Sequence, residues 1–316
     1  MRILSALVGV GIAGLVQLLA AGGGVAPDSQ PSPAAKVVGS ATGKETADGS
    51  SGPDLTGHTL AFDEEFNGPL SVSNRGPGTK WIAHTPYGGD FGEAYFHEPE
   101  PEGWPFKIGN GILNITAWYD PKSKHWYSGL LASVDTAGHG FAQALGYYEV
   151  RMKLPEGPGV WPAFWLNGLG SLGSARGGKT RVAEVDILEE YGVDSRIAHQ
   201  NVHVWNTDGS QYSGTGNSST CQGMTTGFHT YGALVKPDYI HFYFDGVEQW
   251  KTPTPPEAKE PLYVMVDLAL GGGWPIDHTP NPSHLYVDYI RIYAPPPGTT
   301  VAGAAQDIGS AGDGKR

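Results

Sequence analysis

The chain of 316 residues contains a single cysteine, Cys221. One thiol forms no internal disulfide, and it excludes a cysteine-based zinc site. Cationic residues are also scarce, since 20 Lys and Arg stand against 32 Asp and Glu, for a formal charge of −12. A net acidic surface does not attract phosphate backbones or anionic lipid headgroups. We therefore expect no nucleic acid partner, and the same balance mildly disfavours a strongly polyanionic substrate.

Helical periodicity is missing as well. Residues 55–295 contain no convincing amphipathic helix and no internal repeat. Instead, short alternating runs such as residues 147–154 are cut by glycine and proline. Asp245-Gly246 and Gly109-Asn110-Gly111 each separate two such runs, which is a strong hairpin signal. The pattern predicts one all-β domain over residues 55–295, built as an antiparallel sandwich or barrel.

The two ends of the chain have a different composition. Residues 1–24 combine an early arginine, an apolar run and small residues, which is typical of a secretory signal peptide. An uncleaved membrane anchor is the alternative, because the run is almost long enough to span a bilayer. Residues 25–54 read as a disordered linker rich in Pro, Ser and Gly, and residues 296–316 as a flexible tail. We expect a secreted or periplasmic monomer without stable membrane association after signal cleavage.

Residues 183–191 contain four carboxylates, and the candidates for chemistry are Glu184, Asp186 and Glu189. Side chains alternate along a strand, so Glu184 and Asp186 share a face. Strict alternation would place Leu188 beside them and would turn Glu189 to the other face. A β-bulge adds one residue to a strand, and bulges are common next to active sites. The sequence therefore predicts a bulge near Leu188 that brings the three acids into one row.

Such a row suits glycoside hydrolysis. Retaining glycosidases use two carboxyl groups about 5–5.5 Å apart, one as the nucleophile and one as the acid/base. Two long Glu side chains leaning inward from a curved strand can reach this separation. Three adjacent carboxylates cannot all ionise at ordinary pKa values, so at least one pKa must rise, as a general acid requires. A solvated acidic strand face and a set of calcium ligands are the alternatives.

The surrounding sequence resembles glycoside hydrolase family 16, the family of laminarinases, lichenases and bacterial exopolysaccharide depolymerases. The resemblance extends over about residues 60–293. It implies a concanavalin-like β-jelly-roll, a curved antiparallel β-sandwich with a concave substrate cleft. It is carried, in chain order, by residues 62–68 (FDEEFNG), 146–157 (GYYEVRMKLPEG), 161–165 (WPAFW), 184–189 (EVDILE) and 287–293 (VDYIRIY).

The resemblance also implies a mechanism. Glu184 matches the nucleophile, Glu189 the acid/base, and Asp186 the residue that hydrogen-bonds to the nucleophile and tunes it. The reaction would be a double displacement with net retention and no catalytic cofactor. The neighbouring Glu190 should point to the opposite face of the strand. The implied function is endo-acting cleavage of a β-linked polysaccharide, such as a β-1,3- or β-1,3-1,4-glucan or a bacterial exopolysaccharide.

Two other functions share this scaffold. A polysaccharide transglycosylase uses the same catalytic residues and differs in the acceptor of the glycosyl intermediate. A non-catalytic carbohydrate-binding protein is the second alternative. It is disfavoured because all three carboxylates are present.

Further site residues follow from the resemblance by position. Trp165 is equally interpretable as a core aromatic, and His203, which we expect beside Glu189, as a buried structural histidine. The candidate sugar ligands are Trp161, Trp165, Glu93, His203 and Trp274. A structural calcium on the convex side would use Glu65, Gly111 and Asp288, partly through backbone oxygens, because Ca²⁺ prefers hard oxygen ligands.

One segment departs from many relatives. Residues 168–181 carry three cations, Arg176, Lys179 and Arg181, within a glycine-rich loop that precedes the acidic strand. We consider two interpretations: a loop that borders the cleft and meets acidic groups on a substrate, or a plain solvated loop.

Overall fold

The computed structural model describes residues 52–100, 104–173 and 177–299. The predicted signal peptide, nearly all of the predicted linker and most of the predicted tail lie outside these residues. The described chain forms strands β1 to β19 and two short 3-10 helices, η1 (Leu169–Ser171) and η2 (Pro256–Lys259). None of the described residues forms a helix long and apolar enough to cross a bilayer.

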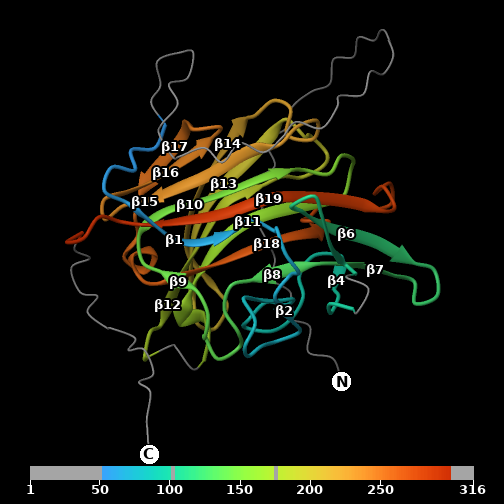
Figure 1. Ribbon diagram of the computed structural model, residues 1–316, viewed down its shortest axis with the longest axis horizontal. Coiled ribbons are helices and arrows are strands. Elements are labelled where there is room, and N and C mark those ends of the chain that lie inside the picture. Colours follow the sequence, from blue (N-terminus) through green and yellow to red (C-terminus); the bar gives the residue numbers. More distant parts are fainter. Residues whose placement is uncertain (1–51, 101–103, 174–176, 300–316) are drawn as a thin grey trace, which may run out of the picture.

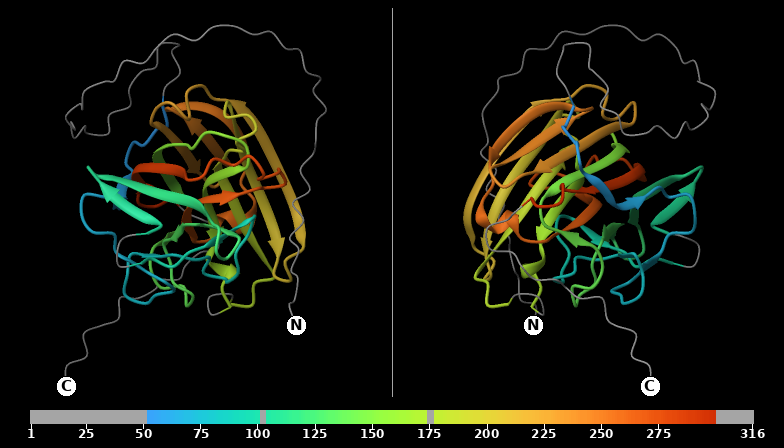
Figure 2. Two further views of the ribbon diagram at one scale, coloured as in Figure 1. Left: turned by 90° about the vertical axis from the view of Figure 1, so that its right-hand side faces the viewer. Right: turned by 60° about the vertical axis from the view of Figure 1, so that its left-hand side comes forward.

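The strands form two packed sheets, as the two views of Figure 2 show. The β19 sheet has the order β17-β16-β15-β10-β19-β6-β7-β4, with β1 beside β19 and β5 beside β6. Its strands are β1 (Thr59–Glu64), β4 (Ala94–Phe96), β5 (Phe106–Gly109), β6 (Ile112–Asp120), β7 (His125–Ser128), β10 (Gly146–Lys153), β15 (His229–Val235), β16 (Tyr239–Phe244), β17 (Val247–Pro253) and β19 (Ser283–Ala294).

The β12 sheet has the order β14-β13-β12-β11-β18-β8-β3-β2, with β9 beside β18 (Figure 1). Its strands are β2 (Val72–Ser73), β3 (Trp81–Ile82), β8 (Leu130–Ala132), β9 (Ala142–Gln143), β11 (Val160–Gly168), β12 (Arg181–Glu189), β13 (Ile197–Asn206), β14 (Gln211–Thr220) and β18 (Leu262–Leu270). The prediction of an all-β antiparallel sandwich is confirmed, and two short pairs, β2–β3 and β4–β7, are parallel.

The main core lies between the two sheets. On β10 the residues Tyr148, Val150 and Met152 are fully buried there, as alternation predicts. A second apolar cluster covers the other face of the β12 sheet and includes Trp165 and Tyr263. Strand β18 is therefore buried at every position, because apolar side chains cover both of its faces.

Both predicted hairpins are confirmed. Asp245 and Gly246 join β16 to β17 with φ values of 48° and 79°. Asn110 and Gly111 join β5 to β6 with φ values of 54° and 69°. Two successive residues with positive φ match the twist of the flanking strands, which is why Asn-Gly and Asp-Gly are favoured there.

The predicted bulge is also present in β12. Against β11, Phe164 pairs with Leu188 and Trp165 pairs with Asp186, so that Ile187 is an extra residue. Against β13, the register shifts between Asp186 and Glu189. Ile187 and Leu188 both point into the main core, with 2% and 0% of their surface exposed. Glu189 therefore returns to the face that carries Asp186.

Truncation of Leu188, which packs in the main core next to Ile187, tests this packing. Leu188→Ala should lower the free energy of unfolding by about 2–5 kcal/mol, because it leaves a cavity in the main core. The matched truncation Val193→Ala removes methyl groups from a side chain that is 52% exposed, and it should cost less than about 0.5 kcal/mol. Chemical denaturation measures both values. Equal small effects would mean that Leu188 faces solvent and that the bulge is absent.

Candidate active site

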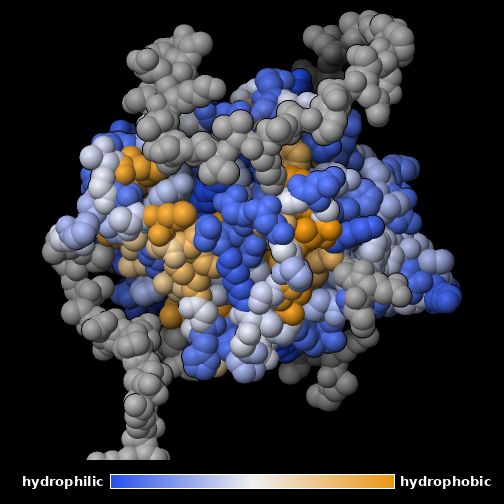
Figure 3. Space-filling model, in the orientation of Figure 1, coloured by the Kyte–Doolittle hydropathy of each residue, from blue (hydrophilic) through white to orange (hydrophobic). Residues whose placement is uncertain are grey.

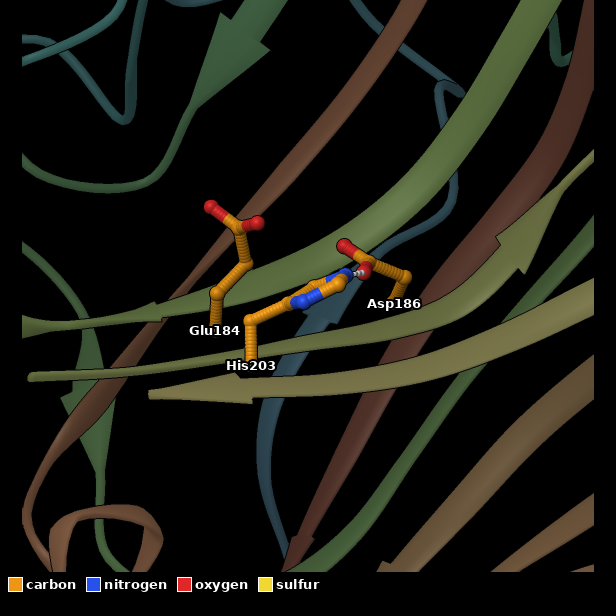
Figure 4. Close-up of side chains that lie close together, drawn as sticks. All are labelled: Glu184, Asp186 and His203. Atoms are coloured by element: carbon orange, nitrogen blue, oxygen red, sulfur yellow. Dashed lines mark ion pairs between the residues drawn. The ribbon is translucent and has the colours of Figure 1, made fainter. Parts of the chain in front are cut away.

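Glu184, Asp186 and Glu189 lie on the same face of β12, and we call them the carboxylate row. Figure 4 shows the Glu184 and Asp186 carboxylates beside the imidazole of His203, which comes from the adjacent strand β13. Ligand atoms of these three residues all lie within 4.8 Å of one another. Asp186 is only 5% exposed, whereas both glutamates are half-buried.

The Glu189 carboxylate accepts three hydrogen bonds. Trp161 Nε1 on β11 donates to Oε1 at 2.9 Å, and the Tyr191 hydroxyl donates to the same atom at 3.2 Å. Asn201 Nδ2 on β13 donates to Oε2 at 2.7 Å. The donors come from both neighbouring strands and from the segment after β12, so they fix the carboxylate from three directions.

The Glu184 carboxylate is held on the opposite side of the row. Asn167 Nδ2, which lies opposite Glu184 in the β11 register, donates to Oε2 at 3.1 Å. The Trp205 side chain also lowers the pKa of Glu184, although its indole N–H completes no hydrogen bond with the described residues. Glu184 thus has fewer fixed donors than Glu189.

Burial controls the charge of the row. It raises the pKa of Glu184 to about 7, with a further contribution from the charge of Glu189. It also raises the pKa of Glu189, and the donors Trp161, Asn201 and Tyr191 oppose this rise. Asp186 has a pKa well above its usual value because of burial, with Glu189 and Glu184 adding to the effect. Burial thus favours the protonated form of Asp186, which can donate a hydrogen bond.

The two predicted tryptophans have different environments. Trp161 is half-buried, and its ring stacks on Tyr191 with centroids 5.9 Å apart and planes at 25°. Trp165 is only 6% exposed, and its Nε1 donates to Asp267 at 2.8 Å. Trp161 thus presents a ring edge beside the row, whereas Trp165 has the environment of a core aromatic. Burial raises the pKa of Asp267 to about 8.

His203 lies elsewhere than expected. It is opposite Glu184 in the β12–β13 register, and its Nε2 lies 3.5 Å from Asp186 Oδ2. Glu189 is instead opposite His199 and bonded to Asn201. The expectation that His203 is next to Glu189 is therefore corrected, because the antiparallel register before the bulge already pairs His203 with Glu184. Burial lowers the pKa of His203, so its imidazole is neutral near neutral pH.

Glu93 and Trp274 lie at one edge of the site. Glu93 is exposed; its backbone N–H donates to Leu270 O at 2.9 Å, and its side chain lies over Gly271. Trp274 is 46% exposed on the same loop. Gly272 approaches Trp161 so closely that a Cβ atom there would lie 2.9 Å from the indole ring. The loop therefore borders the side of the row that contains Glu189.

The predicted calcium ligands are engaged by arginines. The Glu65 carboxylate accepts hydrogen bonds from Arg291 Nε at 2.7 Å and Nη2 at 3.1 Å. Asp288 forms an ion pair with Arg151. Gly111 lies in the β5–β6 turn. Because each carboxylate already neutralises a guanidinium, calcium binding through these two side chains would have to displace an arginine.

Two of the three cations in the loop of residues 168–181 also form ion pairs with carboxylates of the chain. Lys179 forms an ion pair with Glu260, and Arg181 lies 3.5 Å from Glu257 on η2. Arg176 lies outside the described residues. Within the described part of the loop, the cations are thus paired with the chain's own carboxylates and do not form a free basic surface.

Sequence reasoning missed several residues of the site. Asn201 lies two positions from His203 on a predicted strand, so a correct register would have found it. Tyr87 gave no comparable signal. It is 43% exposed in a turn closed by Gly88 N–H to Thr85 O at 3.0 Å. Burial raises the pKa of Tyr87 well above its usual value, and Tyr263 and Glu184 add to the rise, which places its phenol near the row.

Glu190, directly after the row, is fully buried on the opposite face. Neither of its carboxylate oxygens has a hydrogen-bond partner among the described residues. It lies close enough to Tyr231 of the β19 sheet to raise the pKa of that phenol. Burial, with a contribution from Asp194, raises the pKa of Glu190 to about 8.

Comparison with known structures first establishes the class of fold. The laminarinase catalytic domain of Thermotoga petrophila superimposes with a TM-score of 0.60 at 22% identity, over 75% of this chain and 98% of that domain. The protein therefore has the same two-sheet jelly-roll architecture. It is a β-sandwich in which the carboxylate row lies along strand β12 of one sheet.

Sequence comparison then establishes the family. Residues 122–291 match the model of glycosyl hydrolases family 16. The chain belongs to glycoside hydrolase family 16. It is 35% identical over 209 residues to an endo-1,3-1,4-β-glycanase of Rhizobium meliloti, over 63% of this chain and 41% of that protein. It is 30% identical over 203 residues to a β-glucanase of Rhodothermus marinus, over 59% of this chain and 69% of that protein. The match thus spans less than half the length of the Rhizobium relative.

The buried Glu190 predicts a pH-dependent stability. Its pKa of about 8 in the folded chain lies above the ordinary value of 4.5. The folded state therefore retains the proton longer, and stability falls as the pH rises from about 4.5 to 8. Glu190→Gln removes this loss. At pH 9 it should raise the Tm by about 5 °C or more over the wild type, and at pH 5 the two should be nearly equal.

Differential scanning fluorimetry at both pH values measures this difference. Glu156→Gln, at an exposed position, is the matched control and should change the Tm at neither pH. A Glu190→Gln benefit of equal size at pH 5 and pH 9 would contradict the buried neutral carboxyl.

Proposed function

We propose that this protein is an endo-acting, retaining glycoside hydrolase that cleaves a β-linked polysaccharide. The observation that carries the proposal is the bulged strand β12, which places Glu184, Asp186 and Glu189 on one face. The two outer glutamates are held by separate sets of donors, and a protonated aspartic acid lies between them. This is the arrangement that a double displacement needs.

In the first step, Glu184 attacks the anomeric carbon while Glu189 gives its proton to the leaving glycosidic oxygen. The bond from the anomeric carbon to that oxygen breaks, and a covalent glycosyl ester forms on Glu184. Glu189, now ionised, then takes a proton from water, whose oxygen attacks the anomeric carbon and releases Glu184. Two inversions give net retention. No metal or cofactor takes part, in keeping with the family.

Asp186 and the donors around Glu189 tune these steps. Burial favours a proton on Asp186, and we propose that this proton is donated in a hydrogen bond to the adjacent Glu184 carboxylate, which favours the anionic nucleophile. Trp161, Tyr191 and Asn201 all donate to Glu189, so they stabilise its ionised form after it has given up its proton. The same bonds orient the carboxyl toward the leaving oxygen.

The substrate we propose is a β-1,3-1,4- or β-1,3-glucan, or a bacterial exopolysaccharide of related linkage. The name of the Rhodothermus relative, a β-glucanase, supports a glucan, and that of the Rhizobium relative, an endo-1,3-1,4-β-glycanase, supports the mixed linkage. We also propose that the protein acts outside the cytoplasm, as a secreted or periplasmic monomer. Recovery of the protein only in the cytoplasmic fraction would contradict the export proposal, and an intact N-terminus, read by Edman sequencing, would contradict signal cleavage.

We do not assign the predicted calcium a role. Glu65 and Asp288 are each occupied by an arginine, so Ca²⁺ would have to displace an ion pair at either position. Calcium binding at these residues stays a prediction from the family resemblance.

Removal of the nucleophile should abolish hydrolysis. Glu184→Gln keeps the size of the side chain but cannot form the glycosyl ester, so kcat should fall by about 10³-fold or more. Glu190→Gln is the matched control, because it is the same substitution in the same segment on the opposite face. It should retain kcat within about twofold. Reducing-sugar release from a panel of β-glucans and bacterial exopolysaccharides measures both.

If the Glu184→Gln and wild-type proteins were equally active, the carboxylate row would not be the catalytic site. Analysis of the products by linkage would identify the substrate bond. The appearance of longer chains at high oligosaccharide concentration would indicate transglycosylation.

The pH profile of kcat/KM should reflect the ionisation of Glu184 and Glu189 in the carboxylate row. The reaction needs Glu184 ionised, and its pKa of about 7 places the acidic limb near that pH, not near 4.5. The reaction also needs Glu189 protonated. Asn201→Ala removes a donor to the ionised Glu189, raises its pKa, and should move the basic limb to higher pH while the acidic limb stays in place. Asn206→Ala, at the end of the same strand, should move neither limb. A basic limb that Asn201→Ala leaves unmoved would assign the general acid elsewhere.

A further inference from the structure

The hairpin of β6 and β7, with β4 beside it, has a set of aromatic side chains that the active site does not use. Figures 1 and 2 show these strands extending from the body of the sandwich. In the register, Trp118 of β6 pairs with Tyr127 of β7, which pairs with Tyr95 of β4. Partners in a register share a face, so these three rings lie side by side on one surface.

Ring contacts connect this surface into a continuous patch. Trp118 and Tyr127 stack with centroids 5.3 Å apart and planes at 30°. Tyr95 lies 6.0 Å from Tyr127 and 5.1 Å from His125. His97 lies 5.4 Å from both Trp118 and Tyr127. We call these five residues, Tyr95, His97, Trp118, His125 and Tyr127, the aromatic face.

The aromatic face is open to solvent. Tyr95 exposes 44% of its surface, His125 is exposed, and the other three rings are half-buried. The face forms one wall of a hollow of about 460 Å³, whose other walls include His84, Asp90 and Glu98. A single exposed ring is ordinary, but a contiguous patch of exposed rings indicates a surface that contacts another molecule.

The chemistry of the hollow fits an uncharged sugar chain. Flat rings pack against the apolar faces of sugars, and carboxylates and imidazoles bond to hydroxyl groups. The described residues that line the hollow include no lysine or arginine. Asp90 and Glu98 would repel a polyanion, and their local partners are weak or neutral: His84 lies 3.8 Å from Asp90, and the Asn74 amide bonds to Glu98.

One loop joins the hollow to the active site. His84 and Asp90 line the hollow, and Glu93, whose side chain lies over Gly271 at the edge of the active site, comes two residues before Tyr95 of the aromatic face. The loop is fixed by Thr85 Oγ1, which donates to Gly89 O at 2.7 Å. A polysaccharide that leaves the carboxylate row past Glu93 would therefore extend toward the aromatic face.

We propose that the aromatic face is a second sugar-binding site, which holds a distal part of the polysaccharide whose other part occupies the active site. This rests on the proposed glycosidase function and narrows its substrate to long, neutral chains. The site contributes affinity for polymer only, because a short oligosaccharide in the active site does not extend to it.

The test uses Tyr95→Ala, made both in the wild type and in Glu184→Gln. Native gels cast with mixed-linkage β-1,3-1,4-glucan or laminarin measure polymer binding by the Glu184→Gln proteins without cleavage. Tyr95→Ala should weaken retardation by about 3- to 10-fold, the effect of losing one ring contact. Tyr95→Trp should restore it. Tyr239→Ala, which removes a ring that is 40% exposed on the outer strand β16, is the matched control and should bind normally.

Kinetics give the second readout. Tyr95→Ala should raise KM for the polymer by about the same factor and leave kcat/KM for a tetrasaccharide of the same linkage unchanged. Gels cast with the carboxymethylated form of the glucan should retard the protein much less. Polymer binding unaffected by Tyr95→Ala, with activity intact, would overturn the second site alone. Equal losses on polymer and tetrasaccharide would also overturn it, since Tyr95 would then act within the active site.

Two further outcomes are distinct. A dimer of the wild-type protein in size-exclusion chromatography that Tyr95→Ala abolishes would make the aromatic face a contact between copies of the chain, and would overturn the proposal. An absence of hydrolysis on every polysaccharide by both the wild-type and the Tyr95→Ala proteins would reject the proposed function itself.

Discussion

The site depends on one extra residue in strand β12. Without the bulge, strict alternation would turn Glu189 into the core and Leu188 toward the solvent. With it, Ile187 and Leu188 both pack in the main core, and the three acids share a face. Burial of two consecutive apolar side chains thus stabilises the register that the chemistry needs. Packing energy on one side of the strand fixes the positions of the carboxyl groups on the other.

Burial of the acids is unfavourable, and the structure offsets it unequally along the row. Glu189 is compensated by three donors, Glu184 by one fixed amide, and Asp186 by remaining protonated. The result is a graded set of proton affinities within one short strand. Such grading arises from the neighbours on β11 and β13, because the acids themselves are chemically similar. The register of the whole β12 sheet is therefore part of the catalytic machinery we propose.

Much of the fold and the row could be predicted from the sequence because both rest on local periodicity. Alternation identified β10, positive-φ dipeptides identified two hairpins, and the spacing of Glu184, Asp186 and Glu189 required the bulge. Residues that depend on long-range contacts were harder. Tyr87 reaches the row from a loop about one hundred positions away, and nothing in its local sequence marks it. His203 was placed beside the wrong acid, because the pairing of β12 with β13, which puts His203 opposite Glu184, is a long-range contact that the local sequence does not show.

The burial of strand β18 limits which substitutions the protein can accept during evolution. It forms the middle of the β12 sheet, and each of its nine positions is buried between two apolar clusters. A substitution in β18 disturbs packing on both faces of the strand at once. This part of the β12 sheet therefore tolerates few substitutions. New preferences for sugars must then arise at the rim, in the loops that carry Tyr87 and Trp274. The architecture thus separates a tightly packed sheet, which tolerates little change, from rim loops in which substitutions disturb the core less.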